Sequence, residues 1–186
     1  MIRRISPFAL AFVLMLSASA AYADTVGIAA PLKHGEQMTA TMVCEFNSQT
    51  NTFTFTITNT TAITNPAVTE SVITAIGFDL PPLGNASEFG LNGFTGAQAP
   101  SLSSNFRFTD ADGGRVPGFK SATLDFLFVT GKTFARGDAV DGIAAGESAS
   151  FVVSGAAFAG FTESDICNSA FLRFEGDGKT TGVPQM

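Results

Sequence analysis

A stretch of alternating residues between positions 38 and 58 constrains the fold more than any other part of the chain. In its second half, phenylalanine and isoleucine alternate with threonine from Thr52 to Thr58. This period of two is typical of a strand with one buried face, and five polar residues, 47–51, separate the two halves. The stretch therefore predicts a β-hairpin. The inward positions of its first half are Met38, Ala40, Met42, Cys44 and Phe46.

The same alternation recurs along the chain and predicts an all-β protein. No stretch combines helix caps with an apolar period of 3.6 residues. About seven to eight antiparallel strands predict a β-sandwich of immunoglobulin-like or jelly-roll type. Further strands are expected at 71–80, 105–109, 121–129, 149–155 and 169–175. The phenylalanines expected between the two sheets are Phe46, Phe53, Phe55, Phe78, Phe126, Phe128, Phe151 and Phe174.

The first 23 residues have the composition of a secretory signal peptide. Arg3 and Arg4 form a basic start, a short apolar run follows, and Ala21-Tyr22-Ala23 supplies small residues for cleavage before Asp24. The alternative is an uncleaved membrane anchor, but the apolar run is short for a bilayer span. The sequence therefore predicts an exported protein, periplasmic or extracellular.

The rest of the chain is expected to form one domain. Residues 24–37 read as a leader with at most a short edge strand at 25–28, and residues 38–176 as the β-sandwich. Residues 177–186 read as a C-terminal tail. The connection from 81 to 104 is long for a compact domain, so it is either a functional loop or contains an element without clear periodicity.

The chain has two cysteines, Cys44 and Cys167. Because export exposes thiols to an oxidising compartment, the pair predicts a disulfide, with Cα atoms about 4.4 to 6.8 Å apart. Such a bridge would join the first hairpin to the last strand. The alternatives are a catalytic thiol or a pair of metal ligands, but neither cysteine has a C-x-x-C partner or a nearby histidine.

Charge and aromatic content disfavour several classes of partner. The net charge is −6, and it becomes more negative when Arg3 and Arg4 are removed, which disfavours nucleic acid and anionic membranes. The chain has no tryptophan, and its single tyrosine, Tyr22, lies in the predicted signal peptide. Sugar- and base-stacking sites depend on these side chains, so such a site is not expected. No run after the signal peptide is long enough for a transmembrane helix.

Catalytic patterns are weak. His34 is the only histidine and lies in the leader, so neither a catalytic triad nor a histidine-rich metal centre has an evident scaffold. Acidic residues pair at Asp138 and Asp141, and at Glu163 and Asp165, but in predicted loops, where they are usually solvated. The sequence therefore predicts a protein that is not an enzyme.

Two short motifs have functional alternatives. Asp110-Ala-Asp112-Gly-Gly places two carboxylates near glycines, and such a turn can bind Ca²⁺ through oxygen ligands. It lacks the remaining spacing of an EF-hand loop, so a polar turn is the simpler interpretation. Arg136-Gly137-Asp138 spells an adhesion tripeptide, although three-residue matches occur often by chance.

Three patches resemble the secreted β-sandwich region of bacterial PEP-CTERM proteins, the substrates of exosortase. They are residues 73–81, the strand entry at 142–151 and residues 171–176. The resemblance implies an extracellular or matrix-associated protein and carries no catalytic residue. The chain departs from the family at 182–186, which have neither a Pro-Glu-Pro motif nor a basic tail, so anchoring by that route is not implied.

The leading hypothesis is an exported, non-enzymatic β-sandwich protein with a structural role at the cell surface or in an extracellular matrix. The alternative is a calcium-assisted ligand-binding or adhesion module built on Asp110, Asp112 and the loop after Pro81. A hydrolase with a carboxylate pair ranks last, because no acid or base has an evident tuned environment. The sequence identifies neither a ligand nor a partner.

Overall fold

The computed structural model describes residues 23–31, 37–62, 71–80, 94–100, 105–110, 115–176 and 179–185. The predicted signal peptide up to residue 22, His34 and Asp112 lie outside these residues. Within them, no helix is long and apolar enough to cross a membrane.

The predicted opening hairpin is confirmed. It consists of β2 (Gln37–Asn47) and β3 (Thr52–Asn59), which pair antiparallel with Cys44 opposite Phe55. The side chain of Asn47 accepts hydrogen bonds from the backbone N–H groups of Gln49 and Thr50, and this closes the turn. The inward residues of both strands are buried except Phe46, while the threonines of β3 are half-exposed on the other face. The side-chain alternation in the sequence therefore set the register correctly.

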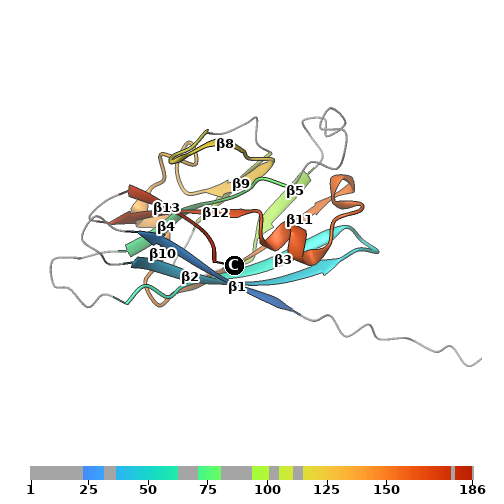
Figure 1. Cartoon of the computed structure of the whole chain (residues 1–186), viewed down its shortest axis with the longest axis horizontal. Helices are drawn as coiled ribbons and strands as arrows, with labels where there is room; N and C mark the ends of the chain where they lie inside the picture. The colour runs from blue at the N-terminus through green and yellow to red at the C-terminus, as the bar shows by residue number, and fades with distance from the viewer. Residues whose placement is uncertain are drawn as a thin grey trace, which may run out of the picture.

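Most strands belong to one antiparallel sheet (Figure 1). Its order is β5-β11-β3-β2-β1-β13-β12-β4-β9-β6, and β10 pairs with β4 beside this path. The strands not yet given bounds are β1 (Asp24–Pro31), β4 (Ser71–Phe78), β5 (Phe94–Gln98), β6 (Arg107–Asp110), β9 (Phe126–Val129), β10 (Ile143–Ala144), β11 (Ser148–Gly155), β12 (Ala170–Gly176) and β13 (Lys179–Pro184).

The sheet curls until its two edge strands, β5 and β6, lie close together. Phe106, next to β6, donates its backbone N–H to the side-chain oxygen of Gln98 on β5 at 2.6 Å. The result is a nearly closed, barrel-like sheet of ten to eleven strands. The all-β, antiparallel class is confirmed. The sheet is continuous and has more strands than the seven to eight predicted for two separate sheets.

The strand β1 corrects the prediction for the leader. All eight of its residues pair with β2, from Asp24 opposite Cys44 to Pro31 opposite Gln37. On its other side β1 pairs with β13, so it is an interior strand, not a short edge strand.

The strand β13 likewise corrects the C-terminal tail. It pairs with β12 as well as with β1, and so joins the two halves of the sheet. A Cβ atom at Gly182 would lie 2.9 Å from the ring of Phe174 and 3.0 Å from Ile28. Glycine therefore lets this strand pack closely over the core.

Phenylalanine rings from both halves of the sheet fill the interior. Phe55 of β3 lies 5.0 Å from Phe78 of β4, and Phe151 of β11 lies 4.7 Å from Phe128 of β9, measured between ring centroids. Of the eight phenylalanines predicted inside, only Phe46 differs, because it is partly exposed near the end of β2. The fully buried ones are Phe53, Phe55, Phe78, Phe126, Phe128, Phe151 and Phe174.

A smaller apolar cluster covers the outer face of β4, β9 and β12. The hairpin of β7 (Arg115–Val116) and β8 (Phe119–Thr123) contributes to it, and the ring of Phe119 lies 5.2 Å from that of Phe171 on β12. This explains why β4 is buried at every position. The buried members of the cluster are Ala75, Val116, Leu124, Leu127, Val129 and Phe134.

In the described part of the chain, three short helical segments interrupt the strands, although the sequence pattern predicts no helix. They are η1 (Ala139–Asp141), η2 (Ala156–Phe158) and α1 (Glu163–Cys167), which leads into β12. Each is too short to show a 3.6-residue period, so the sequence pattern missed them.

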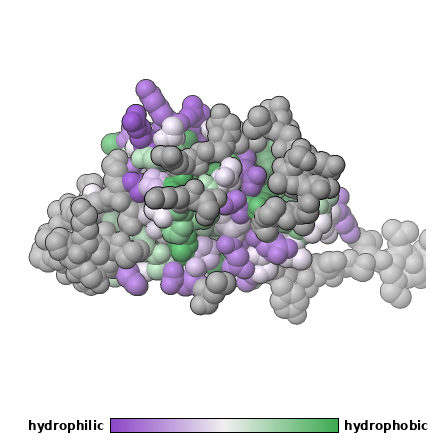
Figure 2. Space-filling model, turned by 45° about the horizontal axis from the view of Figure 1, so that its top comes forward, coloured by the Kyte–Doolittle hydropathy of each residue, from purple (hydrophilic) through white to green (hydrophobic). Residues whose placement is uncertain are grey.

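Exposed large hydrophobic side chains are few among the described residues. On the face drawn in Figure 2, hydrophobic colour forms narrow strips between hydrophilic residues. Among the described residues, the large apolar side chains with high exposure are Val43 and Val140, which are 39% and 89% exposed. Two scattered valines do not form an apolar docking surface.

Candidate functional site

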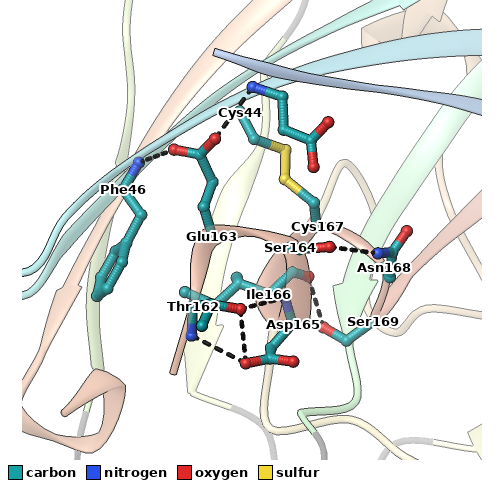
Figure 3. Close-up of a disulfide and its surroundings, with 11 residues drawn as sticks. Cys44, Phe46, Thr162, Glu163, Ser164, Asp165, Ile166, Cys167, Asn168 and Ser169 are labelled. Atoms are coloured by element: carbon teal, nitrogen blue, oxygen red, sulfur yellow. Dashed lines mark hydrogen bonds between the residues drawn. A yellow bond between two sulfur atoms is a disulfide. The ribbon is translucent and has the colours of Figure 1, made fainter. Parts of the chain in front are cut away.

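The short helix α1 has a capping box at its start and a disulfide at its end (Figure 3). Thr162 and Asp165 form a capping box, in which the Thr162 hydroxyl accepts the backbone N–H of Asp165 at 3.2 Å. The carboxylate of Asp165 accepts both the hydroxyl and the backbone N–H of Thr162, and these hydrogen bonds lower its pKa. This motif lets a five-residue helix begin sharply at Glu163.

The disulfide between Cys44 and Cys167 holds the other end of α1. The two Cα atoms are 6.4 Å apart, within the predicted range, and both side chains are fully buried. The sequence suggested that the bridge joins the first hairpin to the last strand. Because Cys167 is the last residue of α1, the bridge instead joins β2 to this helix.

Glu163 adds a polar connection between α1 and the sheet. One carboxylate oxygen accepts the backbone N–H of Asp24 at 3.0 Å, and the other accepts that of Phe46 at 2.7 Å. A single carboxylate thus joins β1 and β2, next to the disulfide (Figure 3). Glu163 was grouped with Asp165 as a loop carboxylate pair, but each has a separate structural task.

A polar hollow of about 290 Å³ lies beside α1. Burial raises the pKa of Asp79 in this hollow, and a hydrogen bond from the backbone N–H of Thr123 partly opposes the rise. The hollow is lined by Asp79, Ser164, Asp165, Asn168 and Ser169.

The polar groups of this hollow already have hydrogen-bond partners within the protein. Asn168 donates to the hydroxyl of Ser164 at 3.0 Å, and Ser169 donates to the carbonyl of Ile166 at 2.7 Å. Ligand pockets are usually larger, at ~300 to 1,000 Å³, and mostly apolar with a few convergent polar groups. The hollow therefore offers one carboxyl group with a raised pKa, that of Asp79, and its other carboxylate, Asp165, is occupied in capping α1.

Of the two predicted calcium ligands, only Asp110 belongs to the described residues. Asp110 ends β6 opposite Phe126, while Asp112 lies outside the described residues. Over the part of the chain that the structure describes, no three His, Cys, Asp or Glu residues gather as a metal site. Calcium binding at Asp110 and Asp112 stays a prediction from the sequence.

The adhesion-like tripeptide has a structural explanation. Gly137 packs against β4, where an added Cβ atom would come within 2.2 Å of the Thr74 side chain. Asp138 caps η1 by accepting the backbone N–H of Val140 at 3.1 Å. Arg136 and Asp138 are exposed, but their glycine is required by the close approach of this loop to the sheet.

Arg173 is a buried charge that the sequence analysis missed. It lies on β12 with only 5% exposure and donates to the hydroxyl of Thr181 at 3.4 Å. Burial lowers its pKa, and the nearby Glu175 opposes this. Alternation with the inward-facing Phe174 would place Arg173 on a solvent-exposed face, but the smaller apolar cluster partly covers this outer face of β12.

The fold and site define an all-β, antiparallel, barrel-like protein with one buried disulfide that fastens a short capped helix to its sheet. No protein-family model, no curated protein and no solved structure matches the chain. The functional conclusion must therefore come from the residues themselves.

Proposed function

We propose that this chain is an exported, non-enzymatic β-protein with a structural role at the cell surface or in an extracellular matrix. The Cys44–Cys167 disulfide carries the proposal. Structural disulfides persist in oxidising compartments and are rare in the cytoplasm of most organisms. The disulfide agrees with the signal-peptide pattern of the first 23 residues.

The use of acidic side chains supports a structural role. Glu163 and Asp165 hold α1, and Asp138 caps η1, so their acceptor oxygens serve the fold. Asp79 has a raised pKa. Among the residues that line its hollow, the other titratable group is the carboxylate of Asp165, which caps α1. Enzymes that use acid–base chemistry need a base or acid aligned with a second functional group, and none is evident among these side chains.

The two halves of the curled sheet act as the layers of a sandwich, with the phenylalanine core between them. We therefore retain the proposed resemblance to the secreted β-sandwich region of PEP-CTERM proteins. With it we retain the matrix-associated role that the resemblance implies. The calcium-assisted alternative ranks second, because the Asp110-Ala-Asp112-Gly-Gly turn lacks the remaining ligand spacing of an EF-hand loop.

The test of export is a fusion of the full chain to a bacterial phosphatase that is active only outside the cytoplasm. We expect phosphatase activity from the full chain in a Gram-negative host and none from a control fusion that lacks residues 2–23. Equal activity from the two fusions, or a full-length fusion that accumulates without activity, would contradict export.

A further inference from the structure

The backbone nitrogen of Asp24 occupies a special position. It is the first nitrogen of β1, lies opposite Cys44 in the β1–β2 register and donates to Glu163 Oε1 at 3.0 Å. It is also the nitrogen that a cut after Ala21-Tyr22-Ala23 would release. Ala23 is exposed and precedes the strand. The predicted cleavage and the hydrogen bond to Glu163 therefore involve the same atom, the backbone nitrogen of Asp24.

We propose that cleavage between Ala23 and Asp24 turns this hydrogen bond into an ion pair between the new α-ammonium group and Glu163. The inference rests on the proposed export and adds an N-terminus-binding site to it. A signal peptidase supplies the catalysis, and one water molecule adds as the C–N bond breaks. Ala23 leaves with a carboxylate, and the nitrogen of Asp24 becomes a protonated amine.

The physical gain comes from charge and from the number of donors. An α-amino group has a pKa of about 7.7 to 8.0, so it is mostly protonated at pH 7. The nitrogen then has three hydrogen-bond donors in place of one. It also carries a positive charge that attracts the carboxylate directly, whereas the uncleaved amide is a neutral donor.

Glu163 is already held in place for this task. Its second oxygen binds the backbone N–H of Phe46 at 2.7 Å, and its helix is fixed by the disulfide at Cys167. The carboxylate therefore loses little side-chain freedom when the ammonium group forms. Processing therefore strengthens the existing connection between the start of β1 and the disulfide-bonded helix.

The test uses the full-length gene and the protein recovered after export. One form has the native junction, and a matched form carries Ser-Gly inserted after Ala23, which keeps the cleavage motif but moves the amine two residues away. Each form is made with and without Glu163→Gln. N-terminal sequencing establishes the first residue, and urea unfolding gives the equilibrium constant of each of the four proteins.

We expect Glu163→Gln to increase the unfolding equilibrium constant by about three- to tenfold more in the native form than in the inserted form. The hydrogen bond to Phe46 changes equally in both forms, so its loss cancels in this comparison. Equal effects in the two forms would overturn the ion pair, since a purely structural glutamate does not sense the position of the amine.

Acylation of the α-amine gives a second readout. We expect Asp24 of the native form to react more slowly than the inserted serine, and Glu163→Gln to remove this difference. An exported protein that begins elsewhere than at Asp24 would overturn the ion pair and leave export intact. An uncleaved chain that stays in the cytoplasm would instead overturn the proposed function itself.

Discussion

Replacing Phe126 by alanine is the strongest test of how the core is built. Phe126 is fully buried, and its ring lies 4.7 Å from Phe78, 4.9 Å from Phe94 and 5.8 Å from Phe158, measured between centroids. A buried Phe→Ala change costs about 3 to 5 kcal/mol, and aromatic pairs add ~0.5 to 1.5 kcal/mol each beyond area. We therefore expect a loss near the upper end, about 4 to 5 kcal/mol, of a stability of roughly 5 to 15 kcal/mol.

Urea unfolding followed by circular dichroism measures this loss, because the chain has no tryptophan and its single tyrosine lies at position 22. With a slope of about 2 kcal/mol per molar urea, the midpoint should fall by roughly 2 M. The control is Thr54→Ala, on the half-exposed face of β3, which should cost on the order of 0.5 kcal/mol. If Thr54→Ala were as damaging as Phe126→Ala, the assignment of inner and outer faces would be wrong.

Three further outcomes are expected. Replacing Cys44 and Cys167 together by alanine should cost up to about 5 kcal/mol in urea unfolding, because the bridge closes a separation of 123 residues, and an unchanged midpoint would contradict this. Asp79 has a folded-state pKa above its ordinary value of 3.8, so stability should fall as the pH rises from that value through the folded-state pKa. Asp79→Asn should remove this fall, and a pH profile identical to that of the wild type would show that Asp79 is not its source. If Asp110 and Asp112 bind calcium, added Ca²⁺ should raise the melting temperature and a chelator should lower it, whereas identical melting curves would exclude such binding.

The strands that the sequence predicted correctly are those with large alternating side chains. Phe53, Phe55 and Ile57 between threonines leave one choice of buried face, and β3 follows it. The disulfide was also predictable, because two cysteines in a chain with an export signal have few other uses. In these segments local pattern and global packing agree.

The missed elements have small or irregular side chains. Val26, Ile28 and Ala30 do alternate inward along β1, but Gly27 and Ala29 between them hide the contrast between the two faces. In β5, which lies in the connection predicted from 81 to 104, no residue is fully buried. Its pairing with β11 comes from backbone hydrogen bonds that no side-chain pattern reports.

The site shows the same division. The spacing of Thr162 and Asp165 is a local capping signal that the prediction of a loop overlooked. The partners of Glu163 have no such local signal, because they are 139 and 117 residues away. Burial of Arg173 depends on what lies over the outer face of its strand, which alternation alone does not reveal. Long-range tertiary contacts therefore decide most of what surrounds α1.

The intact mass of the protein recovered from outside the cytoplasm tests the central claim most directly. Alkylation without prior reduction distinguishes a disulfide between Cys44 and Cys167 from two free thiols. We predict the mass of a chain that begins at Asp24, lighter by two hydrogen atoms than its reduced form and without any alkyl group. A mass that includes residues 1–23, or that carries two alkyl groups, would contradict an exported protein fastened by this disulfide.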